Sequence, residues 1–192
     1  PELGLGSLLF PLEVSALFTD HYLDKGVEVP SDTSVTGIER AGGVARISTK
    51  DGRTLETDVI LAGLGIEPRT ELAAAAGLPV EDGIIVDEHA RVRGHEDVFA
   101  AGDVARFPAA ATDTTMRVEN EDHAKSHGRL AGINMAGADE SYDHLPFFYS
   151  DLFDLGYEAV GELDPRQETL ADWEEENRKG VVYYLDAERH PR

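Results

Sequence analysis

A continuous apolar run, DVILAGLGIEP, fills residues 58–68 and limits what this chain can fold into. It predicts a strand that is buried on both faces, because a strand with one face in water alternates apolar and polar residues. Strands of that kind occur in parallel sheets that carry helices on both sides. The run therefore favours an α/β fold.

The rest of the chain contains shorter signals for helices, strands and turns. In the first part of the chain they predict a helix between Pro11 and Gly26, a strand at 26–29, and a hairpin of 44–48 and 53–55 around Lys50-Asp51-Gly52. In the middle they predict a short helix ended by Gly77, strands at 83–92 and 98–103, and a helix over 118–137 with Asn120 as N-cap. In the last part they predict strands at 157–163 and 181–185, with a solvated acidic loop at 171–180.

Length and composition fit a globular protein of one or two domains, since the chain has 192 residues of which 41% are hydrophobic. No apolar run reaches the roughly 18 residues of a membrane span, and the first residues lack the pattern of a signal peptide. We therefore expect a soluble, cytoplasmic protein. Because the chain has no cysteine, it cannot form disulfides, redox dithiols or thiolate metal sites, and any redox chemistry requires a cofactor.

The charge balance argues against negatively charged partners such as nucleic acid. Asp and Glu number 38 against 17 Lys and Arg, a formal net charge of -21. Such a surface repels nucleic acid and anionic lipid. Lysine is scarce, which together with the surplus of carboxylates is typical of proteins from a high-salt cytoplasm, where screening reduces self-repulsion. An ordinary acidic protein has a similar composition, so both interpretations stay open.

Two glycine clusters resemble nucleotide-binding loops but fail the context test. GLGSLL at Gly4 has Leu9 where the third glycine of GxGxxG belongs, and no predicted strand precedes it. GLGIEP at Gly63 follows a predicted strand but has Pro68 at the third position. The motif requires a strand, a tight turn and a helix. Neither cluster is interpreted as a pyrophosphate loop.

The stretch VFAAGD predicts a buried strand that ends in Gly102 and Asp103. The carboxyl end of such a strand is where open α/β sheets bind ligands, and a carboxylate there can accept hydrogen bonds from hydroxyl groups. The alternative is that Asp103 caps the turn that follows. The spacing alone leaves both interpretations open.

His123 and His127 are four residues apart on the predicted helix, with Glu119 one turn earlier, a spacing that can chelate a metal. The sequence HAKSH lacks the glutamate that acts as general base in HExxH sites. We therefore predict no metal site, and expect both histidines to lie on the helix surface or beside a cofactor.

The series TDVILAGLGIEPRTEL, GIIVDEHARV, VFAAGDVA, RVENEDHAKSHGRLAGINMAG and FFYSDLFDLGYEAVGELD resembles the carboxyl half of the flavin-dependent pyridine nucleotide-disulfide oxidoreductases. Within that superfamily it is most similar to the ferredoxin-reductase-like branch that includes apoptosis-inducing factor. The resemblance covers most of the chain in the right order. It implies FAD and NAD as cofactors, with NADP not excluded.

The resemblance assigns most of the flavin contacts to two segments. Gly102 and Asp103 match the family positions at the ribityl side of FAD. Glu119, Asn120 and Glu121 match the segment beside the flavin ring and nicotinamide, and the helix that follows points its amino end at the flavin pyrimidine edge. Amide N–H groups and the positive end of the helix dipole would stabilise negative charge on the reduced flavin.

Three further residues are assigned by the same resemblance. Gly65 matches a glycine at the nicotinamide pocket, where a missing side chain lets the ring stack close to the flavin. Tyr149 falls where this branch often has tryptophan, near both rings. Glu2 matches an acid that accepts hydrogen bonds from the ribose hydroxyls and repels a 2′-phosphate, so it favours NAD over NADP.

The implied fold is partial. The resemblance divides the chain into the tail of an NAD-binding domain (1–56), the second half of an FAD-binding domain (57–138) and the start of an α+β carboxyl-terminal interface domain (139–192). The two Rossmann-like domains would thus be incomplete, since both GxGxxG loops of the family would lie upstream of Pro1.

The implied function is that of part of an FAD-dependent NAD(P)H oxidoreductase. Hydride passes from nicotinamide to flavin, and electrons pass to a ferredoxin-like protein, a quinone or oxygen, with no catalytic side chain. One alternative is a redox-responsive assembly factor whose oligomeric state, such as a homodimer, changes when NADH reduces the flavin, with LPFFYSD as the switching segment. Another is a fragment that is inactive without its amino-terminal half.

Overall fold

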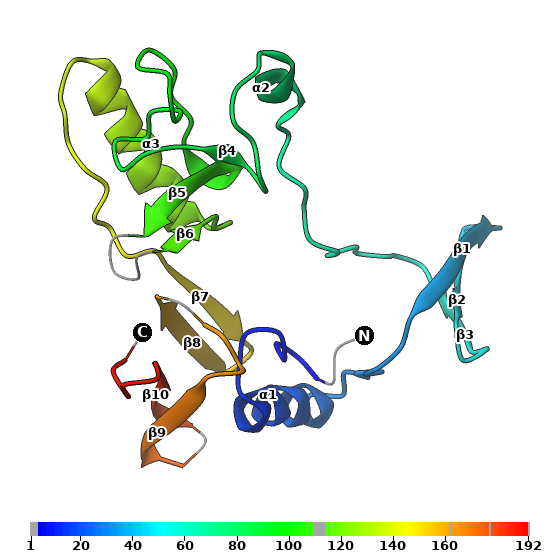
Figure 1. The fold of residues 1–192 in the computed structure, drawn as a ribbon. Coiled ribbons are helices and arrows are strands. Elements are labelled where there is room, and N and C mark those ends of the chain that lie inside the picture. The colour runs from blue at the N-terminus through cyan, green and yellow to red at the C-terminus, as the bar shows by residue number, and fades with distance from the viewer. Residues whose placement is uncertain (1–3, 110–113, 162, 177, 192) are drawn as a thin grey trace. The chain divides into compact units, whose positions relative to one another are not determined.

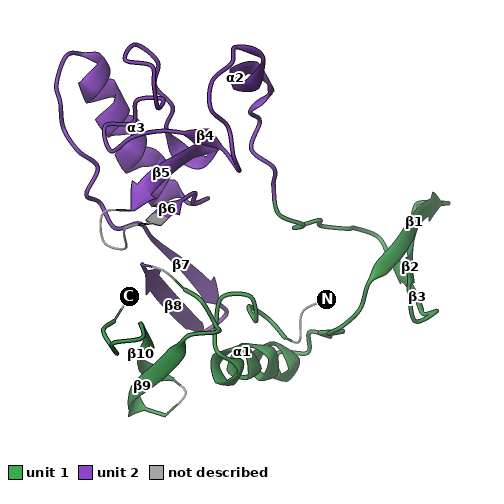
Figure 2. Cartoon of the chain, in the orientation of Figure 1, with its two compact units in different colours: residues 1–65, 163–191 green, residues 66–162, 192 purple. Residues whose placement is uncertain are grey.

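The computed structural model describes residues 4–109, 114–161, 163–176 and 178–191. The chain forms two compact units (Figure 2): unit 1 comprises residues 1–65 and 163–191, and unit 2 comprises residues 66–162. Unit 1 is therefore built from two stretches that are separated in the sequence by all of unit 2. In the described part of the chain, none of the helices combines the length and apolar character that a membrane crossing needs.

Unit 1 contains a helix, a three-stranded sheet and a hairpin (Figure 1). Its elements in chain order are α1 (Leu12–Asp24), β1 (Val35–Ala41), β2 (Val44–Thr49), β3 (Thr54–Thr57), β9 (Glu168–Glu175) and β10 (Lys179–Leu185). All strand pairs in this unit are antiparallel, in the orders β1-β2-β3 and β10-β9.

The boundaries of α1 follow from two residues and confirm the predicted helix. Pro11 is the residue just before the first helical residue. Its missing N–H costs nothing there, because an N–H at the start of a helix has no partner within the helix. Gly26 follows the end with φ +83°, a conformation that glycine adopts without strain. The helix buries Phe18, which meets Phe10 edge to face at 5.3 Å between ring centroids.

The hairpin around Asp51-Gly52 is confirmed as β2 and β3, and the structure adds β1 to it. The β1–β2 turn is made by Gly42 and Gly43, both with positive φ (+61° and +89°). A two-residue turn with positive φ at both positions matches the right-handed twist of the strands. Gly42-Gly43 is thus a hairpin signal that the sequence analysis missed.

Unit 2 combines a small mixed sheet, two helices and a hairpin. Its elements in chain order are α2 (Glu71–Ala75), β4 (Ile84–Ile85), the 3₁₀ turn η1 (Gly102–Val104), β5 (Ala105–Ala109), β6 (Thr114–Met116), α3 (Glu121–Met135), β7 (Phe147–Leu152) and β8 (Leu155–Val160). Strand β4 pairs with β5 in parallel, and β6 pairs with β5 antiparallel. The parallel pair and the helix α3 confirm the α/β class.

The core of unit 2 lies between α3 and the β4–β5 pair. Its buried residues come from six segments of the chain: Val86, Ala90, Val92, Ala100, Ala105, Phe107, Leu130, Ala131 and Tyr142. The core therefore joins α3 to the sheet and to the loop before β7.

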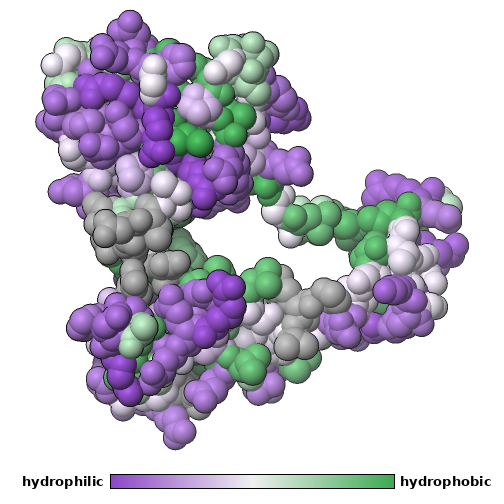
Figure 3. All heavy atoms as spheres, viewed as in Figure 1, coloured by the Kyte–Doolittle hydropathy of each residue, from purple (hydrophilic) through white to green (hydrophobic). Residues whose placement is uncertain are grey.

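The predicted strand at 58–68 is wrong. This segment has no regular secondary structure, and Leu61 and Leu64 are 93% and 92% exposed. Figure 3 shows hydrophobic side chains along it. A strand needs neighbours to accept and donate its backbone hydrogen bonds, and no described strand pairs with these residues. The apolar sequence alone does not supply that partner.

The strand predicted at 83–92 is too long, since only β4 (Ile84–Ile85) is a regular strand within it, and three further predictions need correction. Residues 27–29 form no strand, and Val27 N–H instead donates to Tyr22 O (3.0 Å), closing the turn after α1. In 98–101 only Phe99 is bridged, to Arg91, so the regular strand β5 comes after Asp103 and not before it. The acidic stretch from 171 to 175 is part of β9, because it pairs with β10.

Candidate functional site

The amino end of α3 is held by a side-chain cap. Asn120 has extended backbone angles (φ -145°, ψ 157°), and its Oδ1 accepts the His123 N–H at 2.7 Å. The cap confirms the predicted helix start. The backbone N–H groups of Glu121 and Asp122 also lie in the first turn, where the helix has no carbonyl oxygen that could accept their hydrogen bonds. This end of α3 is therefore suited to a negatively charged or oxygen-rich group.

Both acidic side chains of this turn have basic partners. Glu121 Oε1 lies 2.5 Å from Lys125 Nζ. Asp122 Oδ2 lies 2.5 Å from His144 Nε2 and also accepts the Phe147 N–H at 3.4 Å. The Lys125 ammonium partly offsets the negative charge of Glu121, and the Asp122 contacts attach the start of β7 to α3.

The turn containing Gly102 and Asp103 packs against the same end of α3. Gly102 is buried with φ +72°, and a Cβ placed on it would lie 3.6 Å from the Ala124 Cβ. Asp103 is exposed and lies inside η1, whose N-cap residue, Ala101, makes no capping hydrogen bond through a side chain. The structure thus gives no support to the capping interpretation of Asp103. The alternative, an exposed carboxylate beside a helix amino end, fits a ligand contact.

Arg117 connects these two segments, and the sequence analysis did not single it out. Its Nη1 donates to Glu119 Oε1 (2.8 Å) and to the Asp103 carbonyl oxygen (3.2 Å). Its Nε donates to Asp82 Oδ1 at 3.2 Å. Arg117 directly follows β6, and an arginine at that place carries no sequence signal that separates it from a surface residue.

Tyr149 lies on β7 and is 64% exposed. Strand β7 begins beside the first turn of α3, because the Phe147 N–H donates to Asp122 Oδ2, and Tyr149 is two residues further along this strand. Unit 2 therefore brings together six predicted site residues around one helix end: Gly102, Asp103, Glu119, Asn120, Glu121 and Tyr149. Gly65 belongs to unit 1, with φ +79°, and Glu2 lies outside the described residues. The cofactor roles of all eight stay predictions.

His123 and His127 are both fully buried, so the expectation of a helix-surface position is wrong. The His123 ring stacks on Phe107 (4.5 Å between centroids, 16° between planes), and its Nδ1 is 2.9 Å from the Tyr142 hydroxyl. Neither ring nitrogen of His127 has a hydrogen-bond partner among the described residues. In the same part of the chain, no group of three or more His, Asp or Glu side chains could hold a metal ion.

Burial keeps both rings uncharged. Desolvation lowers the pKa of His123 to about 4, although the Gly102 backbone and the Asp103 carboxylate oppose this shift. Desolvation also lowers the pKa of His127 to about 4, and the neighbouring His123 adds to the effect. At neutral pH the two imidazoles therefore act as aromatic core residues behind the amino end of α3.

The cap predicts a measurable loss of stability. We expect Asn120→Ala to lower the free energy of unfolding by about 1 kcal/mol, because the His123 N–H loses its acceptor. Asn120→Asp keeps an acceptor oxygen and should stay within a few tenths of a kcal/mol of the parent. Urea denaturation followed by circular dichroism measures both. Equal loss in the two variants would contradict a capping role.

Comparisons with known proteins identify the family of the chain. The sequence model of the pyridine nucleotide-disulphide oxidoreductase family matches residues 5–128. The model of the carboxyl-terminal domain of mitochondrion-associated apoptosis-inducing factor matches residues 131–190. The chain belongs to the pyridine nucleotide-disulphide oxidoreductase family. Within it, the chain falls in the ferredoxin-reductase-like branch that includes apoptosis-inducing factor, which confirms the resemblance found in the sequence.

Three relatives illustrate the match. Mitochondrial apoptosis-inducing factor 1 of Dictyostelium discoideum is 33% identical over 97% of this chain and 38% of its own length. Monodehydroascorbate reductase of Pisum sativum is 34% identical over 84% of this chain and 39% of its own length. The crystal structure of the covalent putidaredoxin reductase–putidaredoxin complex matches with a TM-score of 0.87 and 27% identity, covering 97% of this chain and 45% of that one. The chain thus spans less than half the length of these relatives.

Proposed function

We propose that this chain is part of an FAD-dependent NAD(P)H oxidoreductase. The observation that carries the proposal is the capped amino end of α3 beside the buried Gly102 and the exposed Asp103. In a family whose members bind FAD and NAD(P)H, these two features are where a flavin would be held. The remaining contacts, including the glycine-rich loops, would come from segments that this chain does not contain.

The residues present suit FAD. When bound, FAD supplies the redox chemistry, accepting hydride from the nicotinamide and releasing electrons to an acceptor. The carboxylate of Asp103 would accept hydrogen bonds from ribityl hydroxyls. The amides of Glu121 and Asp122 would donate to the flavin pyrimidine edge, where the positive end of the helix dipole favours negative charge. Tyr149 would pack near the flavin and nicotinamide rings. Gly65 and Glu2 would contribute to the nicotinamide site.

For the electron acceptor we propose a chemical class and no individual molecule. One matched structure is a complex of putidaredoxin reductase with putidaredoxin, and another relative is a monodehydroascorbate reductase. Acceptors thus differ within the set of matches. We favour a ferredoxin-like protein, with a quinone or oxygen as alternatives, and we place the reaction in the cytoplasm.

A second candidate function is a redox-responsive assembly factor that forms a homodimer when reduced. The observation that favours it is the β7–β8 hairpin, which exposes three large apolar side chains: Tyr149 (64%), Phe153 (58%) and Val160 (52%). Aromatic residues such as Tyr149 and Phe153 are enriched where proteins associate. Sedimentation of the flavin-loaded protein with and without NADH separates the two functions, because only the assembly factor changes its oligomeric state on reduction.

Titration with FAD tests the first proposal. We expect the chain to retain a structured flavin absorbance band near 450 nm that bleaches on addition of NADH. Asp103→Asn should weaken FAD binding by at least about tenfold, because hydrogen bonds to a charged acceptor are the stronger ones. Asp97→Asn, at another exposed aspartate of unit 2, is the matched control. Absence of retained flavin would refute binding by this chain alone, and equal affinities of the two variants would refute the role of Asp103.

A further inference from the structure

Arg117 contacts both segments of the candidate flavin site through a single nitrogen. Its Nη1 donates to the Asp103 carbonyl oxygen at 3.2 Å and to Glu119 Oε1 at 2.8 Å. Asp103 precedes Arg117 by 14 residues, whereas Glu119 is two residues beyond it. The guanidinium therefore links the turn η1 to the segment that leads into α3.

The guanidinium is also fixed from its other side. Its Nε donates to Asp82 Oδ1 (3.2 Å), and the side chain is only 10% exposed. A Cβ on Gly83 would lie 2.9 Å from Arg117 Cδ, so the arginine stem runs directly along the backbone at that glycine. Three acceptors and a close backbone leave this planar group little freedom to rotate.

Arg117 stays charged despite its burial. Desolvation works to lower its pKa, but the hydrogen bonds to Glu119 and Asp82 outweigh it, and the pKa of Arg117 is raised above its ordinary value. Its two carboxylate partners are more exposed, Asp82 at 59% and Glu119 at 38%, so water screens these pairs and they orient the guanidinium more than they add to stability. The contact between η1 and the start of α3 is therefore held in one arrangement.

We propose that Arg117 is a positioning residue that sets the separation between the Asp103 turn and the amino end of α3. The proposal deepens the proposed function and rests on it, since those two segments are the ones assigned to the ribityl chain and to the flavin ring. Arg117 needs no contact with the cofactor. It holds two contact segments in register before the cofactor binds, which lowers the cost of ordering them on binding.

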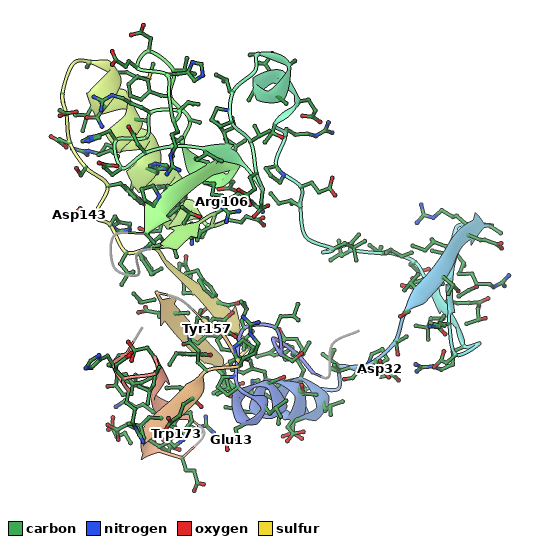
Figure 4. The ribbon with its side chains drawn as sticks, in the orientation of Figure 1. Glu13, Asp32, Arg106, Asp143, Tyr157 and Trp173 are labelled. Carbon is green, nitrogen blue, oxygen red and sulfur yellow. The ribbon has the colours of Figure 1, made fainter. Side chains whose placement is uncertain are left out.

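The test compares Arg117→Lys with Arg106→Lys. Lysine keeps the charge but offers one nitrogen, which cannot reach all three acceptors in the planar arrangement of the guanidinium. Arg106, labelled in Figure 4 on β5, is the matched control. Its Nε donates to Thr115 Oγ1 (3.1 Å) and its Nη1 to the Glu81 carbonyl oxygen (3.4 Å), so it joins no pair of flavin segments.

The first readout is amide hydrogen exchange without FAD. The Ala105 N–H donates to Gly102 O within η1, and the His123 and Ala124 N–H groups donate to Asn120 at the start of α3. We expect Arg117→Lys to accelerate exchange at these amides by about tenfold, with a melting temperature close to that of the parent. Arg106→Lys should leave all three unchanged.

The second readout is the affinity for FAD, which should fall about tenfold in Arg117→Lys and stay unchanged in Arg106→Lys. Exchange at the three amides that matches the control would overturn the proposal. So would faster exchange throughout unit 2 with a lower melting temperature, because it would show a merely structural role. If the parent chain does not bind FAD, binding of FAD by this chain alone is refuted, and the exchange experiment, which uses no FAD, still decides whether Arg117 orders the two segments.

Discussion

Between pH 6.5 and pH 4 the free energy of unfolding should fall by an amount on the order of 5 kcal/mol through His123 and His127 alone. Burial lowers the pKa of each to about 4, whereas an unfolded histidine titrates near 6.5. Over that interval the unfolded chain binds protons that the folded chain does not, so stability rises with pH. The loss begins as pH falls below the unfolded pKa and is complete near the folded one. Urea denaturation at a series of pH values measures it.

His127→Leu isolates this effect. Since neither ring nitrogen of His127 has a partner among the described residues, leucine should be neutral or stabilising by about 1 kcal/mol at pH 7. It should also remove about half of the loss between pH 6.5 and pH 4. His95→Gln, at an exposed histidine of unit 2, controls for the loss of an imidazole as such. An acid dependence that is the same in His127→Leu and the parent would refute the prediction.

Gly83→Ala should lower the free energy of unfolding by about 3 kcal/mol or more. Gly83 has φ +119°, outside the regions that alanine adopts without strain, and a Cβ would lie 2.9 Å from the Val104 carbonyl oxygen and from Arg117 Cδ. The residue immediately precedes β4, so relief of the clash would move β4 away from β5. Urea denaturation of the purified variant measures the loss.

Gly94→Ala is the control for backbone strain alone. Gly94 has φ +83°, and a Cβ there would meet nothing within 4 Å. We expect a loss of about 1 kcal/mol, the cost of a left-handed conformation in an alanine. A Gly83→Ala variant no less stable than Gly94→Ala would show that β4 and β5 accommodate the extra methyl group.

The features that the sequence predicted well are those set by neighbouring residues. Pro11 and Gly26 bound α1, Asp51-Gly52 marks the β2–β3 turn, and Asn120 caps α3. Each is a local rule that acts over three or four residues. In the candidate site, the cap by Asn120 is of this kind, whereas the cofactor roles rest on the family resemblance and stay predictions.

The features that the sequence could not predict depend on distant partners. The run at 58–68 has the composition of a central strand, but a strand exists only if other strands pair with it. On α3 the buried face includes His123, His127 and Asn134, whereas Met135 is 68% exposed. Hydropathy assigns imidazole to the surface, yet a neutral ring that stacks on Phe107 is a core residue. The role of Arg117 also depends on acceptors from other segments.

Unit 1 is built from two stretches that are far apart in the sequence, and this separation affects how the chain folds while it is being synthesised. The Tyr184 hydroxyl donates to the Leu9 carbonyl oxygen at 2.9 Å across 175 positions of sequence. At the usual rate of roughly 5 to 20 residues per second, roughly 10 to 35 seconds pass between the emergence of these two residues from the ribosome. Unit 2 is continuous and can fold in that interval, whereas the segment before α1 must wait for β10. Folding is therefore ordered by translation, with the middle of the chain completed before its two ends meet.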